Sequence, residues 1–162
     1  MNTRTRGFTL VESLIALLLL SLGLLGAGVL LLESLRAHAD AISQATATHL
    51  VRDMAERIRA NPHARALYDT RSGIAGDAGC DFNAACDPAQ RAATDLAHYA
   101  AAARVTFPGV DTSAHIEFEP AIGPAAPDRY RISLQWRGPR DSDAVRPAVT
   151  LILLARPVAG QA

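Results

Sequence analysis

The sequence contains no lysine, and its 16 arginines balance 16 acidic residues to a net charge of zero. A neutral chain exerts no long-range attraction on phosphates, so we do not expect a nucleic-acid partner. Cysteine is scarce too, with only Cys80 and Cys86. The chain also lacks a G-x-S-x-G nucleophile motif, a P-loop and an H-E-x-x-H metal motif. These absences argue against the common hydrolases, nucleotide-binding enzymes and zinc peptidases.

Residues that often perform catalysis are present but dispersed. The five histidines lack metal-ligand spacing, and the five residues between the cysteines fit neither C-x-x-C redox chemistry nor a zinc knuckle. We therefore expect no enzyme activity, catalytic residue, cofactor or metal site. Six charged residues of the predicted strands are expected on solvated strand edges and faces, rather than in acid/base pairs or phosphate sites. They are Glu117, Glu119, Asp128, Arg129, Arg131 and Arg137.

A second absence defines the N-terminal third, because no charge occurs from Ser13 to Leu32. Eleven leucines lie between Leu14 and Leu32, and this length suffices to cross a membrane as a helix. On an insertion scale these leucines contribute very roughly −3 to −7 kcal/mol, whereas one buried carboxylate costs about +3 kcal/mol. Insertion should therefore tolerate Glu12 at the start of the apolar run.

Charge on the two sides of this run predicts its orientation. Arg4 and Arg6 precede it, and Glu33 and Asp40 follow it, so the N-terminus should be cytoplasmic and the remainder periplasmic. An ordinary signal peptide cleaved after the A-x-A-like residues 37–39 is the alternative. Its apolar region should span only about 7–15 residues, fewer than are present here.

The string Gly7-Phe8-Thr9-Leu10-Val11-Glu12 resembles the type III signal of type IV pilins and type II secretion pseudopilins. The resemblance implies that prepilin peptidase cleaves between Gly7 and Phe8, that Phe8 is N-methylated, and that the apolar anchor is retained. Cleavage creates an amine at Phe8 that opposes the helix dipole, and the Glu12 carboxylate could neutralise it. The resemblance favours the amine of an adjacent subunit as the partner. Peptidase recognition or membrane topology is the alternative role for Glu12.

A single long helix is predicted over residues 8–60, after a cleaved leader at residues 1–7. Its first half, about 8–32, would span the inner membrane, and its second half, about 33–60, is amphipathic. The apolar stripe of that second half recurs at helical spacing. It comprises Leu35, Ala39, Ile42, Leu50, Met54 and Ile58. The opposite face offers Arg52/Glu56 and Asp53/Arg57 pairs, and Asn61-Pro62 should end the helix.

The remaining residues, 61–162, predict a small periplasmic head. A loop carries Cys80 and Cys86, which should form a disulfide in an oxidising compartment. Asp87-Pro88 and Gln90 resemble a helix start with a capping box, which predicts a helix over about 88–103. Alternating segments predict antiparallel strands at about 114–119, 129–137 and 148–156, the last apolar on both faces and hence more buried. The expected class is α+β, with a long transmembrane helix followed by this head, as in type IV pilins.

A second resemblance concerns the end of the long helix. The chain is similar here to the PilV-type minor pilins, the type IV pilus modification proteins. The similarity lies in residues 53–62, in residues 21–26 and in the cysteine pair before a Pro-capped helix. This implies a low-abundance subunit that starts pilus assembly with other minor and major pilins, first in the inner membrane and then in the surface pilus. A type II secretion pseudopilin is the main alternative. A membrane-anchored periplasmic enzyme is the least supported.

Overall fold

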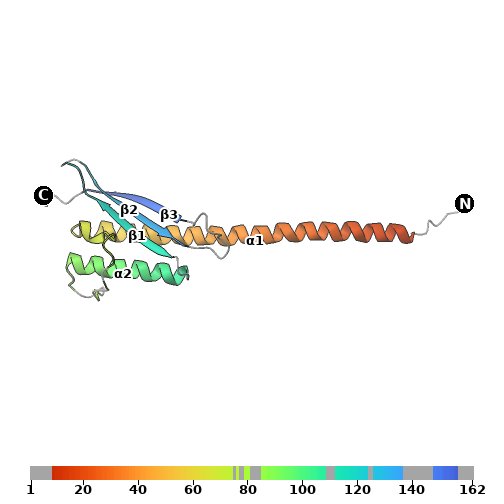
Figure 1. The fold of residues 1–162 in the computed structure, drawn as a ribbon, viewed down its shortest axis with the longest axis horizontal. Helices are drawn as coiled ribbons and strands as arrows, with labels where there is room; N and C mark the ends of the chain where they lie inside the picture. The colour runs from red at the N-terminus through yellow and green to blue at the C-terminus, as the bar shows by residue number, and fades with distance from the viewer. Residues whose placement is uncertain are drawn as a thin grey trace, which may run out of the picture. The chain divides into compact units, whose positions relative to one another are not determined.

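The computed structural model describes residues 9–74, 76, 79–80, 85–108, 112–123, 126–136 and 148–156. It divides into two compact units, Met1–Ser43 and Gln44–Ala162. Helix α1 spans Leu10–Ala60 and contributes to both units (Figure 1). The predicted leader and the first residue of the predicted helix, Phe8, lie outside the described residues.

The second unit begins with the last part of α1 and continues through five further elements. A short 3-10 helix, η1, spans Arg65–Tyr68, and α2 spans Pro88–Thr106. Strands β1, β2 and β3 span Ser113–Glu119, Asp128–Gln135 and Ala148–Ala155. Helix α2 extends three residues beyond the predicted end, and β2 stops at Gln135. The α+β class, with a long apolar helix before a small antiparallel sheet, is confirmed.

The three strands form an antiparallel sheet in the order β1-β2-β3. The register pairs Ile116 with Ile132 between β1 and β2, and Ile132 with Leu151 between β2 and β3. Alternation along β2 buries Tyr130, Ile132 and Leu134 on one face, as the period-two pattern predicts. That face forms the core with residues from α1 and α2.

Helix α1 enters this core at Ala47, which is followed by Val51, Met54, Ala55 and Ile58. Only the last part of the predicted apolar stripe is therefore buried, because Leu35 and Ile42 are each more than half exposed. The predicted ion pair between Arg57 and Asp53 is present, with 2.8 Å between Nε and Oδ2. Glu56, however, binds Arg59 rather than Arg52, one turn toward the helix end.

Strand β3 differs from the prediction of a more buried strand. Leu153 alone is fully buried, whereas Ile152 and Leu154 are each 58% exposed. In the described part of the chain only one face of the sheet packs against the core, so Ile152 and Leu154 on the other face stay exposed. Strand β3 also lies at the edge of the sheet, so Val149 and Leu151 on the packed face are only partly buried. The residue just after β2, Trp136, stacks on Phe107 at the end of α2, with ring centroids 4.7 Å apart, and both rings are buried in the core.

Candidate functional site

The N-terminal end of α1 carries the residues that the signal motif singled out. Gly7 and Phe8 lie outside the described residues, and Glu12 is exposed in the first turn. The Thr9 hydroxyl accepts the Glu12 amide at 3.3 Å, and the Thr9 carbonyl accepts the amides of Glu12 and Ser13 at 3.0 and 3.2 Å. Thr9 therefore occupies the N-cap position, and the spacing T-x-x-E was the signal for it. No helix cap was predicted at Thr9.

The helix beyond Glu12 presents apolar surface on all sides. Each of the eleven leucines between Leu14 and Leu32 is more than half exposed. Helix α1 is long and apolar enough to cross a membrane, and none of its apolar segment is buried within the chain. Such a surface is stable only against lipid or other apolar helices. The segment thus combines a capped helix start, one carboxylate and an uncovered apolar surface.

A polar network joins the end of α1 to η1 and α2. The Asp95 carboxylate of α2 accepts the Tyr68 hydroxyl at 2.8 Å and the Arg57 guanidinium at 3.0 Å. The Asn61 amide donates to the Tyr68 hydroxyl at 3.2 Å and to the Pro88 carbonyl at 2.9 Å. We call these four side chains, Arg57, Asn61, Tyr68 and Asp95, the clasp. It fixes the three helices together where α1 ends.

The pKa shifts of Tyr68 and Arg57 agree with the hydrogen bonds of the clasp. Burial raises the pKa of Tyr68 well above its ordinary value; the Asn61 hydrogen bond lowers it, but the bond to Asp95 and that carboxylate's charge raise it further. Tyr68 therefore stays protonated and donates. The hydrogen bond that Arg57 donates to Asp53 raises the pKa of Arg57; partial burial opposes this rise and Asp95 reinforces it. No local pattern predicts this pairing, because Tyr68 and Asp95 are 27 residues apart in the sequence.

The structure contradicts the prediction made for Asp128. It was expected on a solvated strand edge, but its side chain is 2% exposed and accepts two hydrogen bonds of 2.9 Å from Arg65 of η1. The Ala121 amide donates a third at 2.9 Å. Burial raises the pKa of Asp128, but these partners outweigh it and leave the pKa below its ordinary value. Burial and the nearby Asp128 charge raise the pKa of Tyr130 to about 12.

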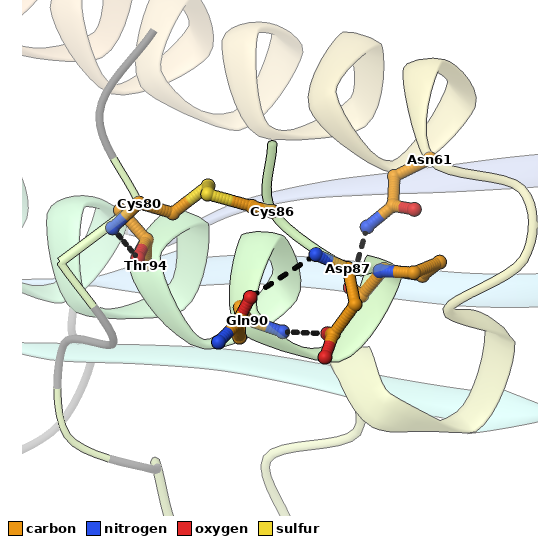
Figure 2. The surroundings of a disulfide bond; sticks show 7 residues. Asn61, Cys80, Cys86, Asp87, Gln90 and Thr94 are labelled. Atoms are coloured by element: carbon orange, nitrogen blue, oxygen red, sulfur yellow. Dashed lines mark hydrogen bonds between the residues drawn. A yellow bond between two sulfur atoms is a disulfide. The ribbon is translucent and has the colours of Figure 1, made fainter. Parts of the chain in front are cut away.

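The two cysteines form a disulfide, with their Cα atoms 6.0 Å apart (Figure 2). The Cys80 amide donates to the buried Thr94 hydroxyl of α2 at 3.2 Å. After Cys86, the Asp87 side chain accepts the Gln90 amide at 2.8 Å, and the Gln90 side chain accepts the Asp87 amide at 3.1 Å. This is the capping box that the sequence predicted. The disulfide thus ties the loop to the start of α2.

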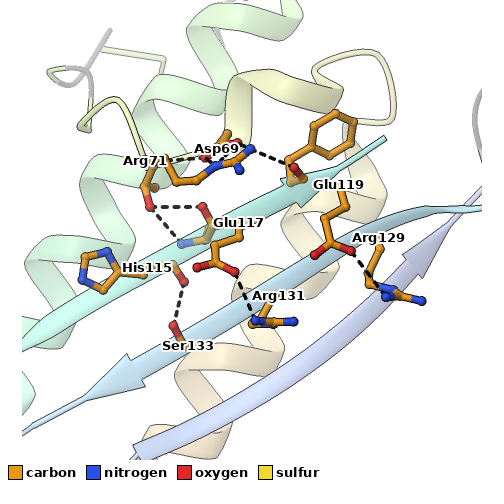
Figure 3. A network of polar contacts seen from close by, with 11 residues as sticks. Asp69, Arg71, His115, Glu117, Glu119, Arg129, Arg131 and Ser133 are labelled. Atoms are coloured by element: carbon orange, nitrogen blue, oxygen red, sulfur yellow. Dashed lines mark hydrogen bonds and ion pairs between the residues drawn. The ribbon is translucent and has the colours of Figure 1, made fainter. Parts of the chain in front are cut away.

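Ion pairs and hydrogen bonds occupy the outer face of the sheet (Figure 3). Glu117 of β1 pairs with Arg131 of β2 at 3.3 Å, and Glu119 pairs with Arg129 at 3.4 Å. All four side chains are about half exposed, as expected for a solvated face. Each arginine already has a carboxylate partner, so this face presents no unpaired cation for phosphate at these positions. Arg137 lies outside the described residues.

The described residues contain no group of three histidine, cysteine or acidic side chains that could hold a metal. The described part of the head includes pockets of about 210 and 230 Å³. Thr112, Ser113 and His115 line the first, but the Thr112 hydroxyl donates to the Phe107 carbonyl rather than to the imidazole. What the described residues do offer is an arrangement suited to association. Its elements are an apolar helix with one carboxylate near its start, and a head held to that helix by the clasp.

Comparison with known families agrees with this geometry. The model for the type IV pilin Tt1218 matches residues 29–101, and the prokaryotic N-terminal methylation motif matches residues 2–28. No curated protein and no solved structure matches the chain. A match to the methylation motif is thus followed directly by a match to a type IV pilin family model, and together they support a role as a pilin. The motif implies processing by a prepilin peptidase and assembly with pilins, and the apolar helix fits a membrane-anchored pilin.

Proposed function

We propose that this protein is a minor pilin of the type IV pilus, which helps to start assembly together with other minor and major pilins. The observation that carries the proposal is the methylation motif over residues 2–28 adjoining a pilin match over residues 29–101. The similarity of residues 53–62 to the PilV-type minor pilins favours the minor class. Those residues include Arg57 and Asn61 of the clasp, so the similar segment coincides with a structural junction.

In this proposal prepilin peptidase cleaves after Gly7, Phe8 is N-methylated, and Glu12 pairs with the Phe8 amine of a neighbouring subunit. Both charges lie at the start of an apolar helix, where an unpaired charge is costly and an opposite charge nearby interacts more strongly than in water. Glu12 is exposed in the described structure, so its carboxylate is accessible to a partner. The pairing would fix the axial register between subunits. The subunit is inserted once in the inner membrane, with its head periplasmic, before it joins the pilus.

The test compares Glu12→Ala with Glu33→Ala, which removes another exposed carboxylate of α1 just after the apolar run. The measurement is the amount of each variant in sheared pili, relative to the amount correctly processed in the membrane. Glu12→Ala should be processed but absent from pili, because the neighbour's amine has no partner. Glu12→Asp should be partly defective because its side chain is shorter, whereas Glu33→Ala should behave like wild type. Normal incorporation of processed Glu12→Ala contradicts the pairing.

A type II secretion pseudopilin is the second candidate, because residues 8–12 carry the signal common to both groups. The two functions separate by phenotype. A minor pilin should be found in sheared surface pili, and its deletion should reduce piliation. A pseudopilin should be absent from those pili, and its deletion should block secretion while piliation stays normal.

A further inference from the structure

The two edges of the sheet are not equivalent. The chain segment after η1 covers the edge of β1 that does not pair with β2. The Thr70 amide and hydroxyl both donate to the Ile116 carbonyl. The Ile116 amide donates in turn to the Thr70 hydroxyl at 2.9 Å. Arg71 donates to the Phe118 carbonyl at 3.0 Å (Figure 3). In the described part of the chain, β3 pairs with β2 alone. Among the described residues, the β1 edge is therefore covered and the β3 edge, which we call the open edge, is not.

The open edge lacks the features that normally prevent pairing with another chain. Proteins protect exposed edges with charged side chains, proline, bulges or very short strands. Strand β3 has eight residues, A-V-T-L-I-L-L-A, without charge or proline. Ile152 and Leu154 are exposed on the outer face, and Val149 and Leu151 are only partly buried on the inner face. Both faces would gain apolar burial from an added strand.

We propose that the open edge of β3 binds an edge strand of a different pilin-type subunit, which adds parallel to β3 and extends the sheet. The proposal rests on the pilin role and adds to it a surface, a binding mode and the character of the partner strand. Main-chain hydrogen bonds from alternate residues of β3 would supply affinity. Uncharged, apolar side chains beside Ile152 and Leu154 would supply selectivity.

A second copy of this chain does not fit the open edge. Antiparallel pairing of two β3 strands requires a two-fold axis perpendicular to the sheet. That axis reverses the core-packed part of α1, residues 47–58, which lies against the sheet. The chain would then enter the two heads from opposite directions, although both are anchored in one membrane. Head-to-tail addition of a copy fails as well, because its β1 edge is closed by Thr70 and Arg71.

The direction of the added strand follows from the same constraint. Strands β1 and β3 are each antiparallel to β2, so they run parallel to one another. A neighbouring pilin-type head that is anchored in the same orientation presents its first strand parallel to β3. The required partner is therefore a subunit whose first strand has an uncovered edge, unlike the one described here.

A pocket of about 230 Å³ at the C-terminal end of β3 adds a further preference. Leu154, Ala155 and Arg156 of the strand end line it together with Ile58, Pro62 and Tyr130. Two other lining residues are already paired, Arg59 with Glu56 and Asp128 with Arg65. Arg156 is exposed, and its guanidinium forms no ion pair with another described residue. The partner strand is thus expected to carry an apolar side chain followed by an acidic one near this end.

The experiment places a photo-crosslinking phenylalanine analogue at Ile152 in the full-length protein in cells, with the same analogue at His115 as control. His115 is exposed on the outer face of β1, the closed edge. The analogue at Ile152 should give a product with a second protein that itself carries a type III signal, and the analogue at His115 should not. A product with another copy of this chain, an intrachain product, or no product in cells whose pili contain the wild-type protein overturns the proposal.

A charge at the open edge provides the second measurement. Ile152→Lys should lower incorporation into pili about tenfold or more, because the ammonium opposes strand addition, while His115→Lys should have little effect. A cooperative urea transition of Trp136 fluorescence in both variants shows that the head still folds. Equal incorporation of the two variants, with wild type present in pili, refutes strand addition but leaves the pilin function intact. Absence of wild type from pili refutes the pilus function itself.

Discussion

Disruption of the clasp should loosen the head from the end of α1. The perturbation is Asp95→Ala, which removes the acceptor of the Tyr68 hydroxyl and of one Arg57 hydrogen bond. A hydrogen bond to a charged group contributes about 1.5–3 kcal/mol. Arg57 is about one-third exposed and retains Asp53, so its share is smaller. We therefore expect a loss of about 2–4 kcal/mol in the free energy of unfolding.

Trp136 provides the assay, because it is the only tryptophan and is buried against Phe107 in the head. Urea unfolding of the detergent-solubilised protein, followed by Trp136 fluorescence, therefore reports the head and not the apolar helix. The matched control is Glu119→Ala, which breaks a half-exposed ion pair with Arg129 and should cost about 0–1 kcal/mol.

A double-mutant cycle separates the clasp from general damage. Tyr68→Phe alone should cost about 1–2 kcal/mol, because the ring stays buried and only the hydroxyl is lost. Combined with Asp95→Ala it should cost less than the sum of the two, by about 1 kcal/mol or more, because each change removes the same bond. A coupling energy below about 0.5 kcal/mol, or a loss for Asp95→Ala no larger than for Glu119→Ala, refutes this account of the clasp.

Three other predictions concern processing, the disulfide and acid. The intact mass of the membrane-extracted protein should correspond to a chain that begins at Phe8 with one added methyl; a mature N-terminus at Asp40 contradicts cleavage at the type III signal. Cys80→Ser should destabilise the head by about 2–3 kcal/mol in urea, and an unchanged midpoint contradicts a stabilising bridge. Because the pKa of Asp128 is lowered by folding, its contribution is present above the ordinary value of 3.8 and lost as the pH falls through the folded value. Asp128→Asn should therefore reduce the loss of stability in acid, and an unchanged pH profile contradicts the linkage.

Local signals predicted much of the fold because each one depends on neighbours in the sequence. Asp87, Pro88 and Gln90 predicted the start of α2, and the structure contains the same capping box. Asn61-Pro62 predicted the end of α1, which stops at Ala60. The alternation in β2 gave its buried face correctly, because a two-residue period needs no knowledge of the partner strands.

The errors arose where a partner is distant in the sequence. The aspartate at 128 next to an arginine resembled a solvated pair, but its partner is Arg65, 63 residues earlier. The apolar strand 148–156 resembled a central strand, because composition alone does not distinguish a strand covered on both faces from an edge strand with one exposed face. At the N-terminal site, the type III signal identified Glu12, while the role of Thr9 as helix cap required the backbone hydrogen bonds.

The continuity of α1 has a mechanical consequence. One uninterrupted helix contains both the apolar anchor and, from Ala47 to Ile58, a wall of the head's core. Tension between anchor and head is therefore carried along the helix axis by backbone hydrogen bonds. Stretching the last turns would withdraw Val51 and Met54 from the core. We expect the head to open as the helix yields, so that the resistance of the core to unfolding also sets the load that this part of α1 can bear.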